Sequence, residues 1–327
     1  MSDPRICIIG AGSLSTKRIY PYIGAAGAQL VGVCDLDAGK AETNARRFGG
    51  RPYADMDAML NAERPDGVIV CIGPEAHAEL AVRVMRRGTP VYTEKPPAPS
   101  AAAALQVARV SRETGVLCTT AFKKRYNTAY SRAKHWLDGF DPADRYSLSI
   151  DYASAQYAND GSPRRTFLSD FCIHAIDLVG WLFGEVAEVF AFAIGPDAFA
   201  VSLRFACGAV GSMNLTDGRS FSVPTEEVEL TVRGGNWMSI HNSSCWRIAE
   251  GGQCVEWREP PTFTSAGDSG HDTGHLPEIV DFLAAIGEGR TTRSTIFESY
   301  KSMVLLEAIE ASAASGEVVR VAYEDLA

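Results

Sequence analysis

A short apolar run ending in two closely spaced glycines constrains this chain more than any other feature. Residues 5–10 (RICIIG) predict a buried strand, and the turn Gly10-Ala11-Gly12 leads from it into a helical pattern over roughly 14–26. A second apolar run, 29–35, follows the helix. The first glycine permits a sharp turn, and the second lets the backbone approach a ligand without a Cβ in the way. This order predicts the first strand–helix–strand unit of a parallel α/β sheet.

The same turn predicts a dinucleotide site. The helix that begins at Ser13 and Leu14 offers free backbone amides and the positive end of its dipole to a pyrophosphate. Asp35 ends the second apolar run about 20 residues after Gly12, close to the spacing at which a carboxylate binds the adenosine ribose. A carboxylate there would repel a 2′-phosphate, so the sequence favours NAD over NADP. Asp37 is an alternative candidate for the ribose role.

The chain divides into two patterns. Further apolar runs at 67–72, 90–93 and 116–120 alternate with helical segments, which predicts a doubly wound parallel sheet. After about residue 145, long runs of alternating polar and apolar residues predict a large, mostly antiparallel open sheet. Helices are expected at about 169–182, 276–287 and 296–314. We therefore expect a dinucleotide-binding Rossmann domain over 1–122 and an α+β domain for substrate binding and oligomerisation over 123–327.

Composition limits the partners and the compartment. The net charge of −9 leaves no basic face for a nucleic acid. No apolar run reaches the roughly 18 residues that a membrane span requires. The eight cysteines form no CxxC pair, and several lie inside apolar runs, so we expect small buried hydrophobes in a reducing, cytoplasmic setting.

Two segments carry candidate chemical groups. Glu94-Lys95-Pro96 follows the fourth expected strand, at the edge where open parallel sheets bind their ligands. An ammonium group there can stabilise a developing alkoxide. Asp170 and His174 are four residues apart in a helical stretch and therefore share one face. A carboxylate beside an imidazole orients it for proton transfer. A role for Asp170 in the first turn of the helix is the structural alternative, and no residue cluster has the spacing of a zinc site.

Taken in order, these segments resemble the Gfo/Idh/MocA oxidoreductase family, which includes inositol and sugar dehydrogenases. The resemblance runs over nearly the whole chain, and its parts are the N-terminal GAG, the strand and turn PDGVIVCIGPEAH, the EKP, the helix DFCIHAIDLVGWLFG and the ending EAIEASAASGEVVRV. It implies that Lys95, Asp170 and His174 are catalytic and bind substrate. It also implies that Glu94 and Lys95 border the nicotinamide. The turn residues Cys71, Gly73 and His77 are further candidates for cofactor contact.

Several other polar residues are candidates by position. Lys123 and Arg125 follow the fifth strand, where the family carries a basic segment, and can reach cofactor phosphate or substrate oxygens. Tyr157, just after the first alternating strand, is placed in the substrate pocket. His271 and His275 lie in a Gly-rich loop and are expected to be solvated.

The sequence leaves the reaction partly open. The first hypothesis is an NAD(P)-dependent dehydrogenase that moves hydride between nicotinamide and a secondary alcohol of a sugar, inositol or related polyol. Either His174 or Lys95 can be the base. A second hypothesis keeps NAD tightly bound for an oxidation and re-reduction cycle, with glycoside cleavage or epimerisation as the outcome. The third is a non-catalytic nucleotide-binding sensor. An apolar outer face of the long sheet is expected to pair subunits into a homodimer or homotetramer.

Overall fold

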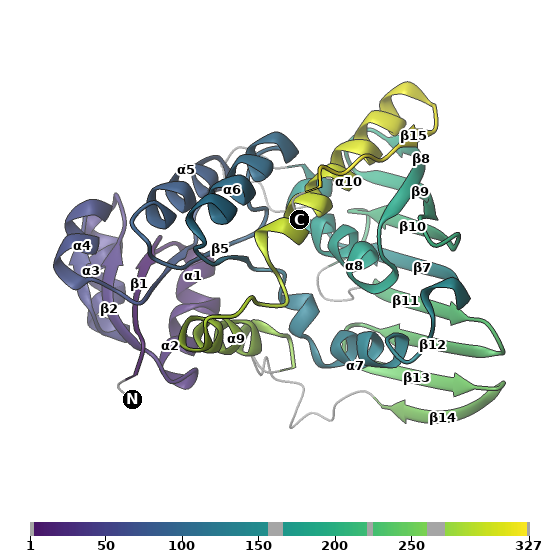
Figure 1. Ribbon diagram of the computed structural model, residues 1–327, viewed down its shortest axis with the longest axis horizontal. Coiled ribbons are helices and arrows are strands. Elements are labelled where there is room, and N and C mark those ends of the chain that lie inside the picture. Colours follow the sequence, from purple (N-terminus) through teal and green to yellow (C-terminus); the bar gives the residue numbers. More distant parts are fainter. Residues whose placement is uncertain (1–2, 156–165, 221–224, 260–271, 326–327) are drawn as a thin grey trace. The chain divides into compact units, whose positions relative to one another are not determined.

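The computed structural model describes residues 3–155, 166–220, 225–259 and 272–325, and the chain folds into two compact units (Figure 1). The first unit contains Met1–Tyr126 and Thr273–Tyr300, and the second contains Asn127–Asp272 and Lys301–Asp325. This division differs from the expected domains, 1–122 and 123–327, in two segments. Both Lys123–Tyr126 and Thr273–Tyr300 belong to the first unit. No helix in the described part of the chain is both long and apolar enough to span a bilayer.

The first unit is a six-stranded parallel sheet in the order β3-β2-β1-β4-β5-β6. Its strands are β1 (Arg5–Ile9), β2 (Gln29–Cys34), β3 (Arg51–Tyr53), β4 (Gly67–Val70), β5 (Val91–Thr93) and β6 (Cys118–Thr120). Its helices are α1 (Ser13–Arg18), α2 (Tyr20–Ala25), α3 (Ala38–Phe48), α4 (Met56–Glu63), α5 (Pro74–Met85), α6 (Ala101–Thr114) and α9 (His275–Glu288), with a 3₁₀ turn η1 (Lys123–Tyr126). The strand order reverses direction between β1 and β4, which is where doubly wound sheets bind their ligands.

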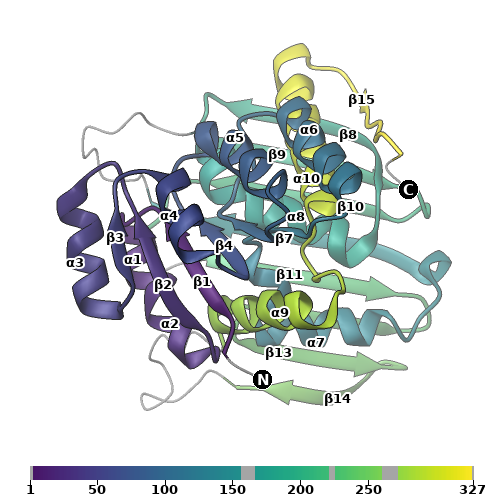
Figure 2. The same cartoon turned by 60° about the vertical axis from the view of Figure 1, so that its left-hand side comes forward.

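Alternation along the strands builds a core on each face of this sheet. Ile6, Ile8 and Tyr92 belong to a buried cluster with α2, α3 and α9, while Cys7 and Ile9 belong to a cluster with α4, α5 and α6. Figure 2 shows α9 lying along the sheet on the face of α2. The continuous apolar runs of the sequence are explained by this double coverage, since both faces of each central strand are buried.

Helix α9 runs antiparallel to the strands that it covers. A Cβ on Gly67, the first residue of β4, would lie 2.7 Å from Ile286 and 3.3 Å from Phe282. The carboxyl end of α9 therefore lies at the amino ends of the strands. It follows that the amino end of α9, at His275, lies toward their carboxyl ends.

The second unit is a nine-stranded sheet in the order β14-β13-β12-β11-β7-β10-β9-β8-β15, mostly antiparallel, with β7 and β10 parallel. Its strands are β7 (Arg145–Ala153), β8 (Val186–Ile194), β9 (Ala198–Phe205), β10 (Val210–Thr216), β11 (Thr225–Val232), β12 (Asn236–His241), β13 (Cys245–Glu250), β14 (Gln253–Arg258) and β15 (Val319–Arg320). Helices α7 (Thr128–Leu137), α8 (Ile173–Phe183) and most of α10 (Ile296–Ser315) lie on one face (Figures 1 and 2). A π-helical turn, η3 (Leu168–Cys172), precedes α8.

The outer face of this sheet is more polar than the sequence predicted. Ser149, Ser202 and Ser212 align on neighbouring strands in its centre. Large exposed apolar side chains include Phe192 (67% exposed) and Trp257 (62% exposed) near the edges and Val210 (54% exposed) on the central strand β10. The expected apolar face is therefore interrupted, because many of the alternating residues that point outward are small or charged.

The expected fold class, a parallel Rossmann sheet followed by a large mostly antiparallel sheet, is confirmed. Differences are local. Strand β3 was missed because Arg51-Pro52-Tyr53 has no apolar run, and the expected helix over 14–26 is split because Pro21 begins a new helix at Tyr20. Helix α7 and the edge strands β14 and β15 were also missed.

Candidate functional site

The glycine turn joins the carboxyl ends of three neighbouring strands. The Gly10 amide donates to the Cys34 carbonyl at 2.8 Å, and the Cys71 amide donates to the Ile9 carbonyl at 2.8 Å. Gly10 has φ +106°, and a Cβ there would lie 2.1 Å from the Cys71 carbonyl oxygen. Only glycine fits this position, since both the backbone conformation and the close approach exclude a side chain.

Gly12 has the opposite surroundings. It precedes the first turn of α1, and a Cβ built on it would meet no atom within 4 Å. The backbone of Gly12 and the exposed Ser13 and Leu14 therefore border open space at the start of a helix. Ser15, three residues after Gly12, is buried and donates to the Gly12 carbonyl at 3.1 Å. Its small side chain thus packs against the turn.

Asp35 connects the end of β2 to the glycine turn. One carboxylate oxygen accepts the Ala11 amide at 2.7 Å, and the other accepts the Asp37 amide at 2.9 Å. Asp35 is half-buried, and each carboxylate oxygen keeps a second lone pair for a ligand hydroxyl. Asp37 instead caps α3, accepting the amides of Gly39 and Lys40 at 3.0 and 3.2 Å. The geometry therefore favours Asp35 over Asp37 for the ribose role.

The buried side chain of His77 is hydrogen-bonded to the Glu94-Lys95-Pro96 segment. Its Nε2 accepts the Ile72 amide at 3.4 Å, and its Nδ1 donates to the Pro96 carbonyl at 2.8 Å. Because an amide can only donate and a carbonyl can only accept, these bonds fix the tautomer with the proton on Nδ1. His77 is 0% exposed, so its contribution to the site is to link the turn after β4, which includes Cys71 and Gly73, to Pro96.

Lys95 and Glu94 follow β5 at the same edge of the sheet as the glycine turn. Glu94 is 8% exposed, and one of its carboxylate oxygens accepts the Lys95 amide at 3.1 Å. Lys95 is half-buried, and its peptide bond to Pro96 is cis. A buried carboxylate thus holds the backbone of the candidate catalytic lysine.

The basic segment after β6 divides into an accessible and an inaccessible part. Lys123 is half-buried, whereas Arg125 is 2% exposed and donates to the Arg293 carbonyl at 2.9 Å. Arg125 therefore supports the fold of the first unit, and Lys123 is the better candidate for ligand contact.

His275 is buried, not solvated as expected: Tyr22 stacks on it at 6.4 Å between ring centroids. Burial and then the charge of Lys123 lower the pKa of His275 to about 2.

The candidate residues of the second unit lie around η3. Asp170 lies within this π turn and is half-buried, while His174 lies in the first turn of α8 and is 9% exposed. A π turn widens the helix locally and occurs often at functional sites. Asp177, one turn after His174, accepts the Ser302 hydroxyl at 2.9 Å and connects α8 to α10. Cys172 is fully buried, which raises the pKa of its thiol.

Family models match both units. The model of the oxidoreductase family with an NAD-binding Rossmann fold matches residues 4–122, and that of its C-terminal α/β domain matches residues 146–321. The chain belongs to the Gfo/Idh/MocA oxidoreductase family. The expected family is thereby confirmed. The expectations that this protein is an enzyme, an oxidoreductase, and that its cofactor is NAD are confirmed as well.

Known proteins are similar to this chain over nearly its full length. A 4-carboxy-2-hydroxymuconate-6-semialdehyde dehydrogenase of Sphingobium sp. is 25% identical over 89% of this chain and 93% of the relative. An inositol 2-dehydrogenase 2 of Saccharopolyspora erythraea is 25% identical over 97% of this chain and 95% of the relative. A levoglucosan dehydrogenase solved with NADH and L-sorbose superimposes with a TM-score of 0.86 at 20% identity, covering 98% of this chain and all of that one.

The residues of the first unit fit the NAD of this family. Gly12 leaves room for a pyrophosphate beside its backbone, and Asp35 has acceptor capacity for ribose hydroxyls. Leu36, which the sequence analysis did not single out, is 96% exposed directly after Asp35 and is a further candidate for cofactor contact. The only available sequence signal for Leu36 was an apolar residue directly after a strand end. Tyr157 and His271 lie outside the described residues.

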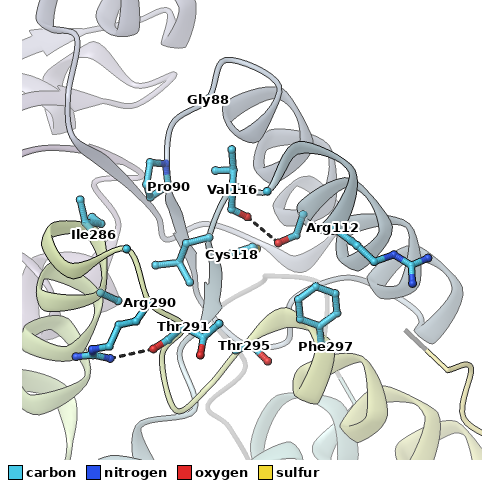
Figure 3. Close-up of a pocket in the computed structure, with 15 residues that line it drawn as sticks. Gly88, Pro90, Arg112, Val116, Cys118, Ile286, Arg290, Thr291, Thr295 and Phe297 are labelled. Carbon is cyan, nitrogen blue, oxygen red and sulfur yellow. Dashed lines mark hydrogen bonds between the residues drawn. The ribbon is translucent and has the colours of Figure 1, made fainter. Parts of the chain in front are cut away.

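A separate pocket opens at the opposite edge of the first unit (Figure 3). It has a volume of about 550 Å³ and lies among Pro90, Val116 and Ile286, at the amino ends of β5 and β6. The guanidinium of Arg290 on its rim forms an ion pair with Asp281 at 2.7 Å. Since parallel sheets bind nucleotides at the carboxyl ends of their strands, this pocket is distinct from the dinucleotide site.

Proposed function

We propose that the protein is an NAD-dependent dehydrogenase that oxidises a secondary alcohol of a sugar, inositol or related polyol. The observation that carries this proposal is the position of Lys95, which directly follows β5 at the carboxyl edge of the sheet and whose amide is held by the buried Glu94 carboxylate. This edge also carries the glycine turn and Asp35. A cation held at that edge is suited to an oxygen whose negative charge grows during the reaction.

The chain's own residues handle the substrate oxygen and its proton. Lys95 stabilises the developing alkoxide, and His174 accepts the hydroxyl proton, with Asp170 orienting the imidazole. The reverse assignment, with Lys95 as the base, uses the same two side chains. Bound NAD, which Gly12 and Asp35 would hold, would supply the acceptor for the hydride of the same carbon.

The proposed substrate class, a sugar, inositol or related polyol, is supported by the relatives. One is named for inositol, and a structural neighbour holds L-sorbose. Another relative of equal identity is named for a semialdehyde, so an aldehyde, oxidised as its hydrate or cyclic hemiacetal, is a second candidate substrate class. Both classes present a carbon that carries an OH and a transferable hydride. An assay panel must therefore contain both.

The test is NADH formation by purified protein across inositols, aldoses, anhydrosugars, polyols and aldehydes. We expect turnover with at least one compound, and we expect Lys95→Met and His174→Gln to reduce kcat at least about 100-fold. Lys134→Met, on the surface of α7 and paired with Asp138, is the matched control. Absence of turnover across the panel, together with unchanged ligand binding by Lys95→Met, would refute the enzyme proposal. Nucleotide that stays bound to the purified protein would instead favour a cycle in which bound NAD oxidises and then re-reduces the substrate.

We also propose a homodimer or homotetramer formed through the outer face of the nine-stranded sheet, in a reducing cytoplasmic setting. Phe192 and Ile194 on β8 are 67% and 80% exposed, and Trp257 on β14 is 62% exposed. All eight cysteines are free thiols, consistent with a reducing compartment. Sedimentation of the wild type and of Phe192→Ser tests the interface. A monomeric wild type would refute it.

A further inference from the structure

Three side chains from different elements hold the backbone of the glycine turn. The Tyr20 hydroxyl of α2 donates to the Gly10 carbonyl at 3.1 Å. The Ala11 amide donates to the Asp35 carboxylate at 2.7 Å. Asn44 of α3 donates from Nδ2 to the Ala11 carbonyl at 3.4 Å. Asp35 already has a proposed role at the cofactor ribose, whereas Tyr20 and Asn44 lie outside the glycine motif and have none.

Asn44 is a buried polar residue on an apolar face of α3. It is 3% exposed, and its neighbours Ala41 and Ala45 belong to the buried apolar cluster on that side of the sheet. Its Nδ2 also donates to the Thr16 hydroxyl at 2.9 Å, so both protons of the amide have acceptors. Burying an amide costs free energy that an apolar side chain of similar size would not incur. Packing alone therefore does not explain an asparagine at this position.

The planarity of the peptide group converts these contacts into a direction for the next amide. In a trans peptide the carbonyl and the following N–H point in opposite directions. The first peptide of the turn shows this, since its carbonyl is bonded to Tyr20 and its N–H to Asp35. In the second peptide the Ala11 carbonyl is directed to Asn44, so the Gly12 N–H is directed away from α3.

The orientation of this second peptide matters for a bound anion. A backbone N–H attracts a pyrophosphate, whereas a carbonyl oxygen repels it. Glycine is conformationally permissive, and a Cβ on Gly12 would meet no atom within 4 Å, so nothing on this side of the residue restrains the peptide. Rotation of the peptide would exchange the N–H for the carbonyl oxygen. The hydrogen bond from Asn44 opposes that rotation before the cofactor binds, which lowers the cost of binding.

We propose that Asn44 is a positioning residue for the pyrophosphate of NAD: by holding the Ala11 carbonyl toward α3, it keeps the Gly12 amide available to the anion. Tyr20 acts in the same way on the preceding peptide, with a smaller effect because Asp35 holds the other side of that peptide. Both side chains act through the backbone. The inference rests on NAD binding by this family and not on the proposed reaction.

Two substitutions test this role by ligand binding. Asn44→Leu keeps the burial and nearly the size but removes both donors, and Tyr20→Phe keeps the ring that stacks on Phe48. We expect NADH to bind at least about 10-fold more weakly to Asn44→Leu and about 3-fold more weakly to Tyr20→Phe. Thr43→Val, at the exposed neighbouring position of α3, loses a hydroxyl that bonds within the helix and is the matched control. It is expected to keep the wild-type affinity.

A comparison of three ligands separates positioning from a general loosening of the fold. NADH and ADP contain the pyrophosphate, whereas adenosine does not. Asn44→Leu is expected to weaken NADH and ADP by the same factor and to leave the affinity for adenosine unchanged. Calorimetric titration measures the three affinities, and a thermal melt shows that each variant is folded at the titration temperature.

The result that would overturn the proposal is an equal loss for all three ligands, or an unchanged affinity for NADH. A larger loss in Tyr20→Phe than in Asn44→Leu would also overturn it. If Asn44→Leu does not fold, Tyr20→Phe decides the matter by the same selective loss of NADH and ADP. These titrations need no turnover, so their outcome is independent of the proposed reaction.

Discussion

The Asp35 carboxylate accepts the Ala11 backbone amide at 2.7 Å, which ties the end of β2 directly to the glycine turn. The residue expected to bind the adenosine ribose therefore also shapes the turn beside it. Charge-assisted hydrogen bonds of this kind contribute more than neutral ones. A substitution of Asp35 is thus expected to affect both the turn and the ligand.

Asp35→Asn is predicted to weaken NAD binding by roughly 10- to 100-fold, because one charged acceptor of ribose hydroxyls is lost. Discrimination against NADP falls at the same time, since the negative charge no longer repels a 2′-phosphate. Titration of intrinsic or nucleotide fluorescence measures both affinities. Asp37→Asn is the control, because asparagine also caps helices well and α3 is retained. A larger loss in the Asp37 variant would assign the ribose to Asp37.

Substitutions of the two glycines of the turn are predicted to have different effects. Gly10→Ala places a Cβ 2.1 Å from the Cys71 carbonyl at a φ of +106°, so it costs at least about 2–3 kcal/mol of stability. Gly12→Ala meets no atom within 4 Å and keeps the thermal midpoint, but its methyl group occupies the space beside the pyrophosphate. Calorimetry and NADH titration on both variants test this contrast. A destabilised Gly12→Ala with normal NADH affinity would contradict it.

The two aspartates near η3 are predicted to differ in function. Asp170→Asn lowers kcat by about 10- to 100-fold with little change in stability, because its expected partner is the imidazole that transfers the proton. Asp177→Ala removes the buried acceptor of the Ser302 hydroxyl and lowers stability by about 1–3 kcal/mol. Kinetics and urea unfolding on both proteins provide the measurement. The proposal for Asp170 fails if its variant loses stability and keeps kcat.

The sequence was sufficient for features that depend on local pattern. The alternation of apolar runs with helical segments determines the doubly wound sheet, and the spacing from Gly12 to Asp35 identifies the nucleotide edge. The location of α9 could not be predicted, because periodicity marks a helix but does not say which sheet it covers. For the same reason Glu278 resembles a solvated residue of an amphipathic helix. Only the structure shows that Glu278 is buried.

His275 is predicted to make the protein sensitive to acid. Its folded-state pKa is about 2, well below the ordinary 6.5, so the unfolded state binds a proton over this window and the folded state does not. The stability associated with neutral His275 is complete above pH 6.5 and decreases by up to about 1.4 kcal/mol per pH unit as the pH falls. His275→Gln removes this dependence. Urea unfolding at pH 7 and pH 5 is expected to show a relative gain for the variant at the lower pH.

Glu278 is predicted to give the opposite dependence. Its folded-state pKa is raised above the ordinary 4.5, because burial and the charge of Glu94 disfavour ionisation. Below pH 4.5 both states hold the proton, and as the pH rises toward the folded-state pKa only the unfolded state releases it. The wild type therefore loses up to about 1.4 kcal/mol per pH unit relative to Glu278→Gln over this range. Urea unfolding of both proteins between pH 5 and pH 8 measures the difference. A constant difference across that range would mean that Glu278 is ionised in the folded protein.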